Sequence, residues 1–273
     1  MSNPRPVALV TGSSRGIGKA LAIMLAKKGY DLVICGKTTQ PHPKLQGSLP
    51  ETESELHALG ATVLSCSVDI RMEDQIQSMF QQIEEKFGRL DVLINNASAI
   101  DLSPVEKLSA KKYDLMQQVN VRGSFLCAQA AYPLLKHSPQ AHVLSLSPPI
   151  DLNPKWFNPH LGYTISKYGM SMLVLGLSAA WKADRIAVNA LWPATIIKTA
   201  AIEFNFPPAL LNKARTVDIV ADAAAWIVSS NPETCTGNFF VDEDVLRAHG
   251  LNDFSAYAVD PTQTLFPDLY LSR

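Results

Sequence analysis

Residues 7–28 read VALVTGSSRGIGKALAIMLAKK and contain an apolar run, a glycine-rich turn and a segment of helical period. Glycines in such a turn let the backbone bend tightly and approach a pyrophosphate, which then lies on the amides of the helix N-terminus. The spacing Gly-x-x-x-Gly-x-Gly differs from the more common Gly-x-Gly-x-x-Gly, but the strand–turn–helix order indicates a dinucleotide-binding unit. Its candidate cofactor-binding residues are Gly12, Ser13, Ser14, Arg15, Gly16, Ile17 and Gly18.

The rest of the chain continues this alternation of apolar runs and helical segments. Strands are predicted at 7–10, 31–35, 62–66, 90–94, 142–146, 186–191 and 238–241. Helices are predicted at 16–28, 51–59, 73–87, 112–136, 163–182 and 218–229, with irregular loops at 38–50 and 148–160. Apolar runs bounded on both sides by helices are typical of a parallel sheet covered on both faces. The predicted fold class is therefore α/β, a single Rossmann-type doubly wound parallel sheet with helices on both faces, in one domain over residues 1–273.

Composition excludes several classes of protein. Of the 273 residues, 47% are hydrophobic and 18% charged, which argues against a disordered chain or a coiled coil. The formal net charge is -1, so there is no basic excess to bind a nucleic-acid backbone. No apolar run is long enough to span a membrane, and the N-terminus lacks the basic and apolar stretches of a signal peptide. We therefore expect a cytoplasmic protein.

The potential metal ligands do not predict a metal site. The scattered cysteines have no C-x-x-C spacing, which indicates reduced, buried thiols: Cys35, Cys66, Cys127 and Cys235. The six histidines do not cluster. The acidic run at 242–244 is more typical of a solvated turn than of a cation site.

Tyr163 and Lys167 form the candidate acid–base pair. Their i, i+4 spacing places both side chains on one face of the predicted helix, one turn apart. A free tyrosine has a pKa of about 10, and a neighbouring lysine ammonium stabilises the phenolate and lowers that pKa. The pair can then supply or remove a proton near neutral pH. Taken alone, such a pair is more ordinary as a core aromatic residue beside a solvent-facing lysine.

The end of the second predicted strand indicates which cofactor is preferred. Enzymes that use NAD usually place an acidic residue there for the ribose 2′-hydroxyl, whereas a basic residue accommodates a 2′-phosphate. This chain has Gly36 and then Lys37, and Arg15 lies in the glycine-rich turn. Two cations can converge on a phosphate and neither position offers a carboxylate, so NADP(H) is the predicted cofactor.

Further motifs follow in a fixed order along the chain. Asn95-Asn96-Ala97-Ser98 comes after the fourth predicted strand, and Tyr163 and Lys167 form a Tyr-x-x-x-Lys pair. Residues 193–199 begin with proline and end with threonine. Together with the glycine-rich turn, this order resembles the short-chain dehydrogenase/reductase family over residues 6 to about 242. Two residues depart from the family's motifs in size, since Ser98 and Ala194 replace glycines.

The resemblance implies an oxidoreductase in which the cofactor carries the hydride, Tyr163 carries the proton, and Lys167 holds the ribose. Asn120 matches the family's active-site asparagine, which implies that it positions a water in a proton relay. Asp69 matches the family's adenine contact, although a helix-capping role is equally open. With Lys37, the predicted cofactor-binding residues outside the turn are Asp69, Asn96, Tyr163, Lys167, Pro193 and Thr199.

One position departs from the family pattern in its chemistry. The family usually has a catalytic serine as the second residue of a Ser-Ser pair that ends the fifth strand, where this chain has Ser147 and Pro148. Proline cannot donate a hydrogen bond to a substrate carbonyl, and strand alternation points Ser147 to the opposite face. Three interpretations are open: Ser147 turns into the site, another group donates, or carbonyl reduction is weakened.

Several local segments narrow the resemblance. They are residues 37–45, 147–149, 153–157, 190–193 and 236–239. These segments are similar to the hydroxysteroid dehydrogenase-like protein 2 group, whose members can carry a C-terminal sterol-carrier domain; none is expected within residues 1–273. The resemblance implies a small or lipid-like carbonyl substrate. Trp156 and Phe157 either cap the core or wall a substrate pocket beside Tyr163.

Two hypotheses of function follow. The first is an NADP(H)-dependent oxidoreductase that interconverts a carbonyl and a hydroxyl group on such a substrate. The alternative, motivated by Pro148, is an NADP(H)-binding sensor or scaffold with little or no turnover. The predicted helices at 112–136 and 163–182 carry few charges, and the family pairs them between subunits, so we expect a homodimer or homotetramer.

Overall fold

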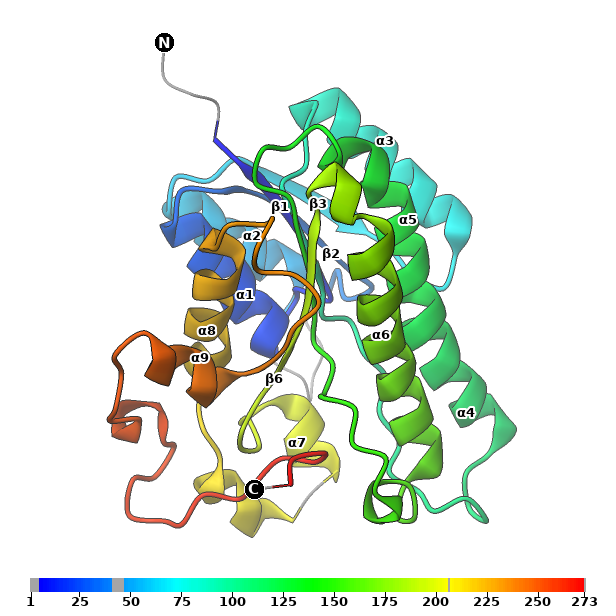
Figure 1. The fold of residues 1–273 in the computed structure, drawn as a ribbon, viewed down its shortest axis with the longest axis vertical. Coiled ribbons are helices and arrows are strands. Elements are labelled where there is room, and N and C mark those ends of the chain that lie inside the picture. Colours follow the sequence, from blue (N-terminus) through cyan, green and yellow to red (C-terminus); the bar gives the residue numbers. More distant parts are fainter. Residues whose placement is uncertain (1–4, 41–46, 206, 273) are drawn as a thin grey trace.

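The computed structural model describes residues 5–40, 47–205 and 207–272, and its strands form one seven-stranded parallel sheet (Figure 1). The strands are β1 (Val7–Thr11), β2 (Asp31–Gly36), β3 (Val63–Ser67), β4 (Val92–Asn95), β5 (His142–Ser145), β6 (Ala187–Trp192) and β7 (Phe239–Val241). Their order is β3-β2-β1-β4-β5-β6-β7, so the direction of winding reverses between β1 and β4. In open α/β sheets, ligands bind at this reversal, beyond the carboxyl ends of the strands.

Helices cover both faces of the sheet (Figure 1). One layer contains α1 (Gly16–Lys27), α2 (Leu49–Ala58), α8 (Asp218–Ser229) and, packed on α8, α9 (Asp242–Ala248). The other contains α3 (Glu73–Phe87), α5 (Ser124–Leu135) and α6 (Leu161–Ala180). Each layer buries its own apolar core against the sheet. The predicted fold class is confirmed.

Helix α3 follows the pattern of its own sequence in both its buried face and its C-terminal end. This helix has the predicted bounds, and its buried side chains recur at three- and four-residue spacing: Ile76, Met79, Phe80 and Ile83. Gly88 ends the helix in the left-handed region, at φ 64°.

α2 begins before the predicted residue 51. The hydroxyl of Ser48 accepts a hydrogen bond from Glu51 N (3.4 Å), which caps the helix so that Leu49 is its first residue. The predicted irregular loop at 38–50 is therefore shorter, and its residues 41–46 lie outside the described ranges.

The segment predicted as one long helix at 112–136 is not a regular α-helix. α4 (Ala110–Met116) continues into a π-helical segment, η1 (Gln117–Gly123), which continues into α5. η1 packs closely, because a Cβ on Gly123 would overlap the side chain of Ile70. Wide π-helical turns are often found at functional sites, and this one carries Asn120.

Residues 242–244 begin a helix, so the expected solvated turn is wrong. Asp242 is fully buried at the start of α9, where its Oδ1 accepts hydrogen bonds from Ala194 N (2.8 Å) and Glu243 N (2.7 Å). Glu243 forms an ion pair with the buried Arg215. Carboxylates are stabilised at a helix N-terminus by its unpaired amides. The acidic residues 242–244 are therefore compatible with the start of α9, a helix that the sequence analysis did not predict.

Two other segments were not predicted. One is the short helix α7 (Ala200–Asn205), which follows β6. The other is the segment of residues 249–272, which pairs at two points with the chain between β6 and α8. Thr195 pairs with Pro267 and Arg215 with Ala258 in antiparallel bridges. The last described residues therefore lie near the carboxyl end of β6.

The described residues also bear on membranes and metals. No helix among them is long and apolar enough to cross a membrane. Nor do three or more His, Cys, Asp or Glu side chains gather in these ranges in a group that could hold a metal ion. The cysteines are free thiols, with Cys35, Cys66 and Cys127 buried and Cys235 partly exposed.

Candidate active site

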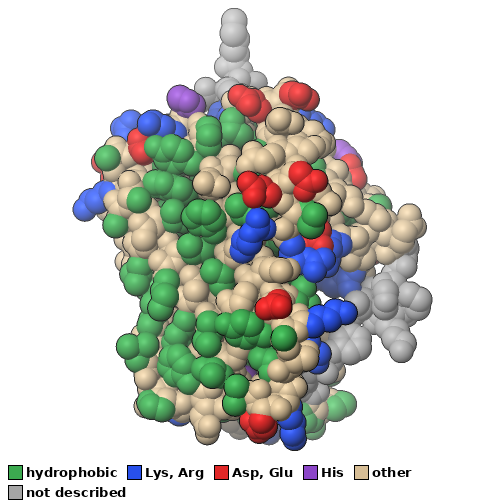
Figure 2. Space-filling model, turned by 90° about the vertical axis from the view of Figure 1, so that its right-hand side faces the viewer, with side chains coloured by type: hydrophobic (Ala, Val, Ile, Leu, Met, Phe, Trp, Pro, Cys, Tyr) green, Lys and Arg blue, Asp and Glu red, His purple; other side chains and the backbone are tan. Residues whose placement is uncertain are grey.

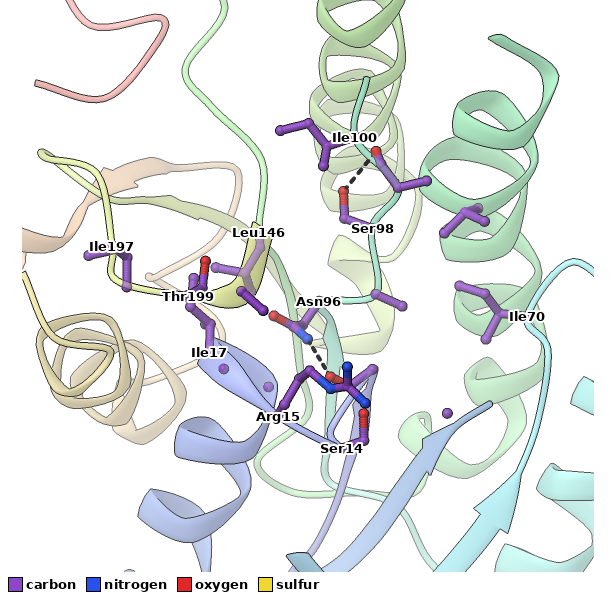
Figure 3. Close-up of a pocket in the computed structure, with 18 of the residues that line it drawn as sticks. Ser14, Arg15, Ile17, Ile70, Asn96, Ser98, Ile100, Leu146, Ile197 and Thr199 are labelled. Carbon is purple, nitrogen blue, oxygen red and sulfur yellow. Dashed lines mark hydrogen bonds between the residues drawn. The ribbon is translucent and has the colours of Figure 1, made fainter. Parts of the chain in front are cut away.

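A cavity of about 510 Å³ lies where the winding of the sheet reverses. Ser14 and Arg15 from the turn after β1, Ser98 from the segment after β4, and Thr199 from the loop after β6 surround Asn96 (Figure 3). The predicted site residues that line this cavity are Gly12, Ser14, Arg15, Gly16, Ile17, Gly18, Lys37, Asp69, Asn96, Tyr163, Lys167, Pro193 and Thr199. Ser13 and Asn120 do not line it.

The glycine-rich turn is tied to β4 by the side chain of Asn96. Its Nδ2 donates hydrogen bonds to the carbonyl oxygens of Thr11 (2.8 Å) and Gly12 (3.1 Å). In return, the hydroxyl of Thr11 accepts hydrogen bonds from Asn96 N (3.0 Å) and Ala97 N (3.1 Å). Gly12 takes a φ of 68°, which favours glycine, and its Cα faces Ala97 with no room for a side chain.

Ser13 has a structural role beside this turn. Its hydroxyl is fully buried and accepts a hydrogen bond from Cys35 N (3.0 Å), which fastens the turn to β2. Ser13 does not line the cavity, and the cofactor contact predicted for it stays a prediction.

Both predicted cations line the cavity. Arg15 donates a hydrogen bond from Nη2 to the carbonyl of Gly47 (2.8 Å), while its Nε is buried with no partner among the described residues. Lys37 is 60% exposed and lies 3.7 Å from Asp69. Hydrogen bonds from Arg71, with the positive charge of Lys37 adding, lower the pKa of the Asp69 carboxyl. Asp69 is not the cap of α3, whose N-cap is Met72.

Tyr163 and Lys167 lie together on α6, and both are buried. The Nζ of Lys167 donates a hydrogen bond to the carbonyl of Leu146 (2.9 Å) and lies 5.5 Å from the centre of the Trp192 ring. Burial lowers the pKa of Lys167 to about 7, and the negative charge of Asp268 opposes this change.

The pKa of Tyr163 changes in the direction opposite to the one expected from its lysine neighbour. Burial raises the pKa of its hydroxyl well above the usual value, and the neighbouring acidic groups of Tyr270 and Asp268 oppose its ionisation further. Lys167 is held by Leu146 and does not offset these effects. Tyr163 therefore keeps its proton at neutral pH in this structure.

Asn120 acts on the backbone beside the cavity. Its side chain is fully buried in η1, where Oδ1 accepts a hydrogen bond from Ala99 N (2.7 Å) and Nδ2 donates to Ala99 O (2.9 Å) and to the hydroxyl of Ser166 (2.9 Å). These three bonds join the segment after β4 to α6. Both N–H groups of its amide are used in these bonds, so the side chain fixes the segment after β4 against α6, and the role in a water relay stays a prediction.

The structure does not place Ser147 in the site. Its hydroxyl is buried with no hydrogen-bond partner among the described residues, and it does not line the cavity. Pro148 is fixed by its carbonyl, which accepts a hydrogen bond from Ser171 Oγ (2.7 Å). Of the three open interpretations, the one in which Ser147 turns into the site is not the arrangement observed.

The C-terminal segment supplies cavity residues that sequence reasoning missed. Asp268 and Leu269 line the cavity, and Leu269 O accepts a hydrogen bond from the indole of Trp192 (2.9 Å), which lines it as well. The fully buried Tyr270 packs against the rings of Trp192 (5.8 Å between centroids) and Tyr168 (5.3 Å). Residues 260–272 have no periodic pattern, so no local signal could have found them.

The open question about Trp156 and Phe157 is answered by this aromatic cluster. Trp156 packs against Tyr270 (5.8 Å) and Phe157 against Tyr168 (5.4 Å), and neither lines the cavity. They cap the cluster from outside rather than wall the pocket.

Comparisons with known proteins identify relatives among the short-chain dehydrogenases. The family model described as short chain dehydrogenase matches residues 6–206. Hydroxysteroid dehydrogenase-like protein 2 of Mus musculus and of Homo sapiens is 48% identical over 264 residues, which is 97% of this chain but 54% and 63% of those proteins. A crystal structure of a putative dehydrogenase from Xanthomonas campestris superimposes with a TM-score of 0.96 at 41% identity, covering 100% of both chains. Both resemblances predicted from the sequence are confirmed, and the chain spans between about half and two thirds of the length of these curated relatives.

The close contact under the glycine-rich turn can be tested at position 18. A Cβ on Gly18 would overlap the carbonyl oxygen of Gly12 and the amide of Asn96. Gly18→Ala should therefore lower the free energy of unfolding by about 1–3 kcal/mol. Gly176→Ala is the control, because this exposed helical glycine has no atom within 4 Å of the added Cβ, and it should be neutral or stabilising. Denaturant unfolding measures both variants; equal stabilities would contradict the close contact.

Proposed function

The chain belongs to the short-chain dehydrogenase family, and we propose that it is an NADP(H)-dependent oxidoreductase that interconverts a carbonyl and a hydroxyl group on a small or lipid-like substrate. One observation carries the proposal: a single cavity is lined both by the glycine-rich turn and by Tyr163 with Lys167. A dinucleotide needs phosphate-binding amides and a reacting end in one continuous space. We propose that residues 1–273 form the single domain that performs this reaction.

The residues of the cavity fit such a cofactor. Gly12 and Gly16 both take positive φ, which lets the turn bend tightly beside the cavity that both residues line. The buried Nε of Arg15 has no partner among the described residues, so a donor stands ready for an anion. The start of α1 contributes its unpaired amides at the same place. The backbone amides would hold the pyrophosphate, and Arg15 would bind the 2′-phosphate.

The proton is the task of this chain's own residues. When bound, the nicotinamide supplies or accepts the hydride. Tyr163 keeps its proton at neutral pH, which is the form that donates to a carbonyl oxygen during reduction. Lys167 lies one helical turn away, buried at the wall of the cavity with its Nζ bonded to Leu146 O, where it would hold the ribose of the cofactor.

The surroundings of Tyr163 favour an apolar substrate. Ile100, Leu146, Trp192 and Leu269 line the cavity, and several of them belong to or contact the apolar cluster around Tyr163. An apolar wall with few polar groups is typical of sites for small hydrophobic molecules. A lipid-like carbonyl compound fits this wall.

The cofactor preference rests on charge at the rim. Lys37 and Arg15 line the adenosine side of the cavity, and the carboxylate of Asp69 is already paired with Arg71. A charge-assisted hydrogen bond contributes ~1.5–3 kcal/mol, reduced where solvent reaches it, so two cations favour a 2′-phosphate.

A second candidate function is a cofactor-binding sensor or scaffold with little turnover. Pro148 and the burial of Ser147 away from the cavity favour it, because both remove the usual donor to the substrate oxygen. Oxidation of NADPH with a panel of aldehydes, ketones and diketones distinguishes the two functions. Saturable NADPH binding without oxidation across the panel supports the sensor, and turnover supports the enzyme.

We also propose that the protein is a homodimer or homotetramer through α5 and α6. Figure 2 shows hydrophobic side chains gathered on the face of the molecule that these helices occupy. The large exposed apolar side chains of the two helices are Phe125, Ile165, Met172 and Leu175. Contiguous exposed apolar surface of this kind marks interaction sites.

The first test of the proposed function removes the hydroxyl of Tyr163. Tyr163→Phe keeps the ring that packs 6.4 Å from Tyr270 but cannot transfer a proton. Turnover should fall by about 10²–10⁴-fold, with the dissociation constant for NADPH unchanged. Steady-state kinetics and fluorescence titration measure the two quantities. A variant that retains most of its activity would show that Tyr163 is not the acid.

The second test reverses the charge at the rim. Wild-type protein should bind NADPH at least about tenfold more tightly than NADH, and Lys37→Asp should reverse that preference by repelling the 2′-phosphate. Lys111→Asp is the matched control, because Lys111 is exposed and does not line the cavity. Dissociation constants for both cofactors decide; equal wild-type affinities would overturn the preference.

The third test concerns assembly. Met172→Glu places a charge on a side chain that is 59% exposed on α6 and should shift the protein towards monomer. Leu152→Glu, at an exposed loop position, should not. Analytical ultracentrifugation at micromolar concentration measures the mass. A monomeric wild type would contradict the proposed assembly.

A further inference from the structure

Asp268 occupies a fixed position at the reacting end of the cavity. Its backbone N donates a hydrogen bond to the carbonyl of Ala194 (3.1 Å), so the segment pairs with the loop after β6. On its other side, Leu269 is bonded to the indole of Trp192, and Tyr270 is buried among aromatic rings. The carboxyl group of Asp268 therefore enters the cavity from an anchored backbone.

One oxygen of this carboxyl is already used, and the other is not. Oδ1 accepts a hydrogen bond from Leu269 N (2.7 Å). Oδ2 has no hydrogen bond to any residue that the structure describes, nor is it among the atoms sealed from solvent. Since Asp268 lines the cavity together with Tyr163 and Lys167, Oδ2 is the free polar atom it offers there.

The site lacks the serine hydroxyl that would donate a second hydrogen bond, beside that of Tyr163, to the substrate oxygen. Pro148 has no hydroxyl, and the hydroxyl of Ser147 is buried outside the cavity. The other hydroxyl side chains on the cavity wall belong to Ser14, Thr38, Ser98 and Thr199. That of Ser98 is turned to the carbonyl of Ala99 (3.4 Å), Thr199 lies beside Gly16, Ser14 belongs to the glycine-rich turn, and Thr38 follows β2. None of them accounts for a second donor beside Tyr163.

We propose that Asp268 is a further catalytic residue, whose carboxylic acid donates to the substrate oxygen the hydrogen bond that Pro148 cannot donate. The proposal rests on the proposed carbonyl–hydroxyl chemistry. In reduction, hydride from the cofactor forms the new bond at the carbonyl carbon, and the proton of Tyr163 forms the new O–H bond. The hydrogen bond from the carboxylic acid of Asp268 stabilises the negative charge that develops on the oxygen.

The surroundings of Asp268 keep its acid form populated at neutral pH. Burial raises the pKa of this carboxyl to about 7, and the negative charge of Asp242 at the start of α9 adds to this effect. Hydrogen bonding from Leu269 N and the positive charge of Lys167 oppose it. The titratable groups that face Asp268 are Tyr163 and Lys167 on α6, Tyr270 in the same segment, and Asp242, itself beside Arg215 and Glu243.

Two isosteric variants separate donation from shape. Asp268→Asn keeps an acceptor for Leu269 N and an N–H donor, so kcat should stay within about fivefold of wild type. Asp268→Leu has no donor, and its kcat should fall about 10²–10³-fold. Asp260→Leu, in the same segment but outside the cavity, should leave kcat unchanged. The dissociation constant for NADPH, measured for all three, should equal that of wild type and shows that each variant is folded.

A spectroscopic measurement reads the acid form directly. The infrared difference spectrum between wild type and Asp268→Asn should contain a carboxylic-acid C=O band at pH 6 that disappears as the pH rises through about 7. Absence of the band at pH 6 overturns the proposal, even if Asp268→Leu fails to fold. Wild-type kcat in folded Asp268→Leu overturns it as well. If none of the carbonyl compounds supports oxidation of NADPH by the wild-type protein, the proposed function itself fails. This result is distinct from the two outcomes that overturn only the role of Asp268.

Discussion

The side-chain amide of Asn96 is the contact on which the site depends. It binds two consecutive carbonyl oxygens of the turn after β1 and thereby joins that turn to the end of β4, across the reversal of the sheet. The next residues after β4 are held in turn by Asn120, which also binds α6 through Ser166. Hydrogen bonds of Asn96 and Asn120, linked through the backbone of residues 96–99, therefore connect the glycine-rich turn to the helix that carries Tyr163.

Features encoded within a few neighbouring residues could be predicted from the sequence. The glycine-rich turn, the apolar stripe of α3 and the pairing of Tyr163 with Lys167 on one helix all depend on short spacings, and the structure has them. Element ends were less certain, because caps such as Ser48 and the π-helical segment around Asn120 depend on tertiary contacts that spacing does not reveal.

The remaining features could not be predicted because their causes lie far apart in the sequence. Asp242 is stabilised by the amide of Ala194, and Tyr270 by rings between positions 156 and 192. Neither residue lies in a local pattern. The acidic run at 242–244 therefore did not indicate a buried helix start, and the aperiodic segment around Tyr270 did not indicate a wall of the cavity. The raised pKa of Tyr163 could not be predicted either, because its main cause is the burial of the side chain.

The position of the 266–272 segment has a consequence for the order in which the protein acquires its properties during synthesis. All seven strands and the glycine-rich turn are encoded before residue 242, so a nascent chain can assemble the sheet and its nucleotide cradle first. The wall that contains Asp268 and Tyr270 joins only after the ribosome has added those residues and they have emerged. Cofactor binding can thus precede a closed reaction chamber, and the chemical competence of the site is acquired late.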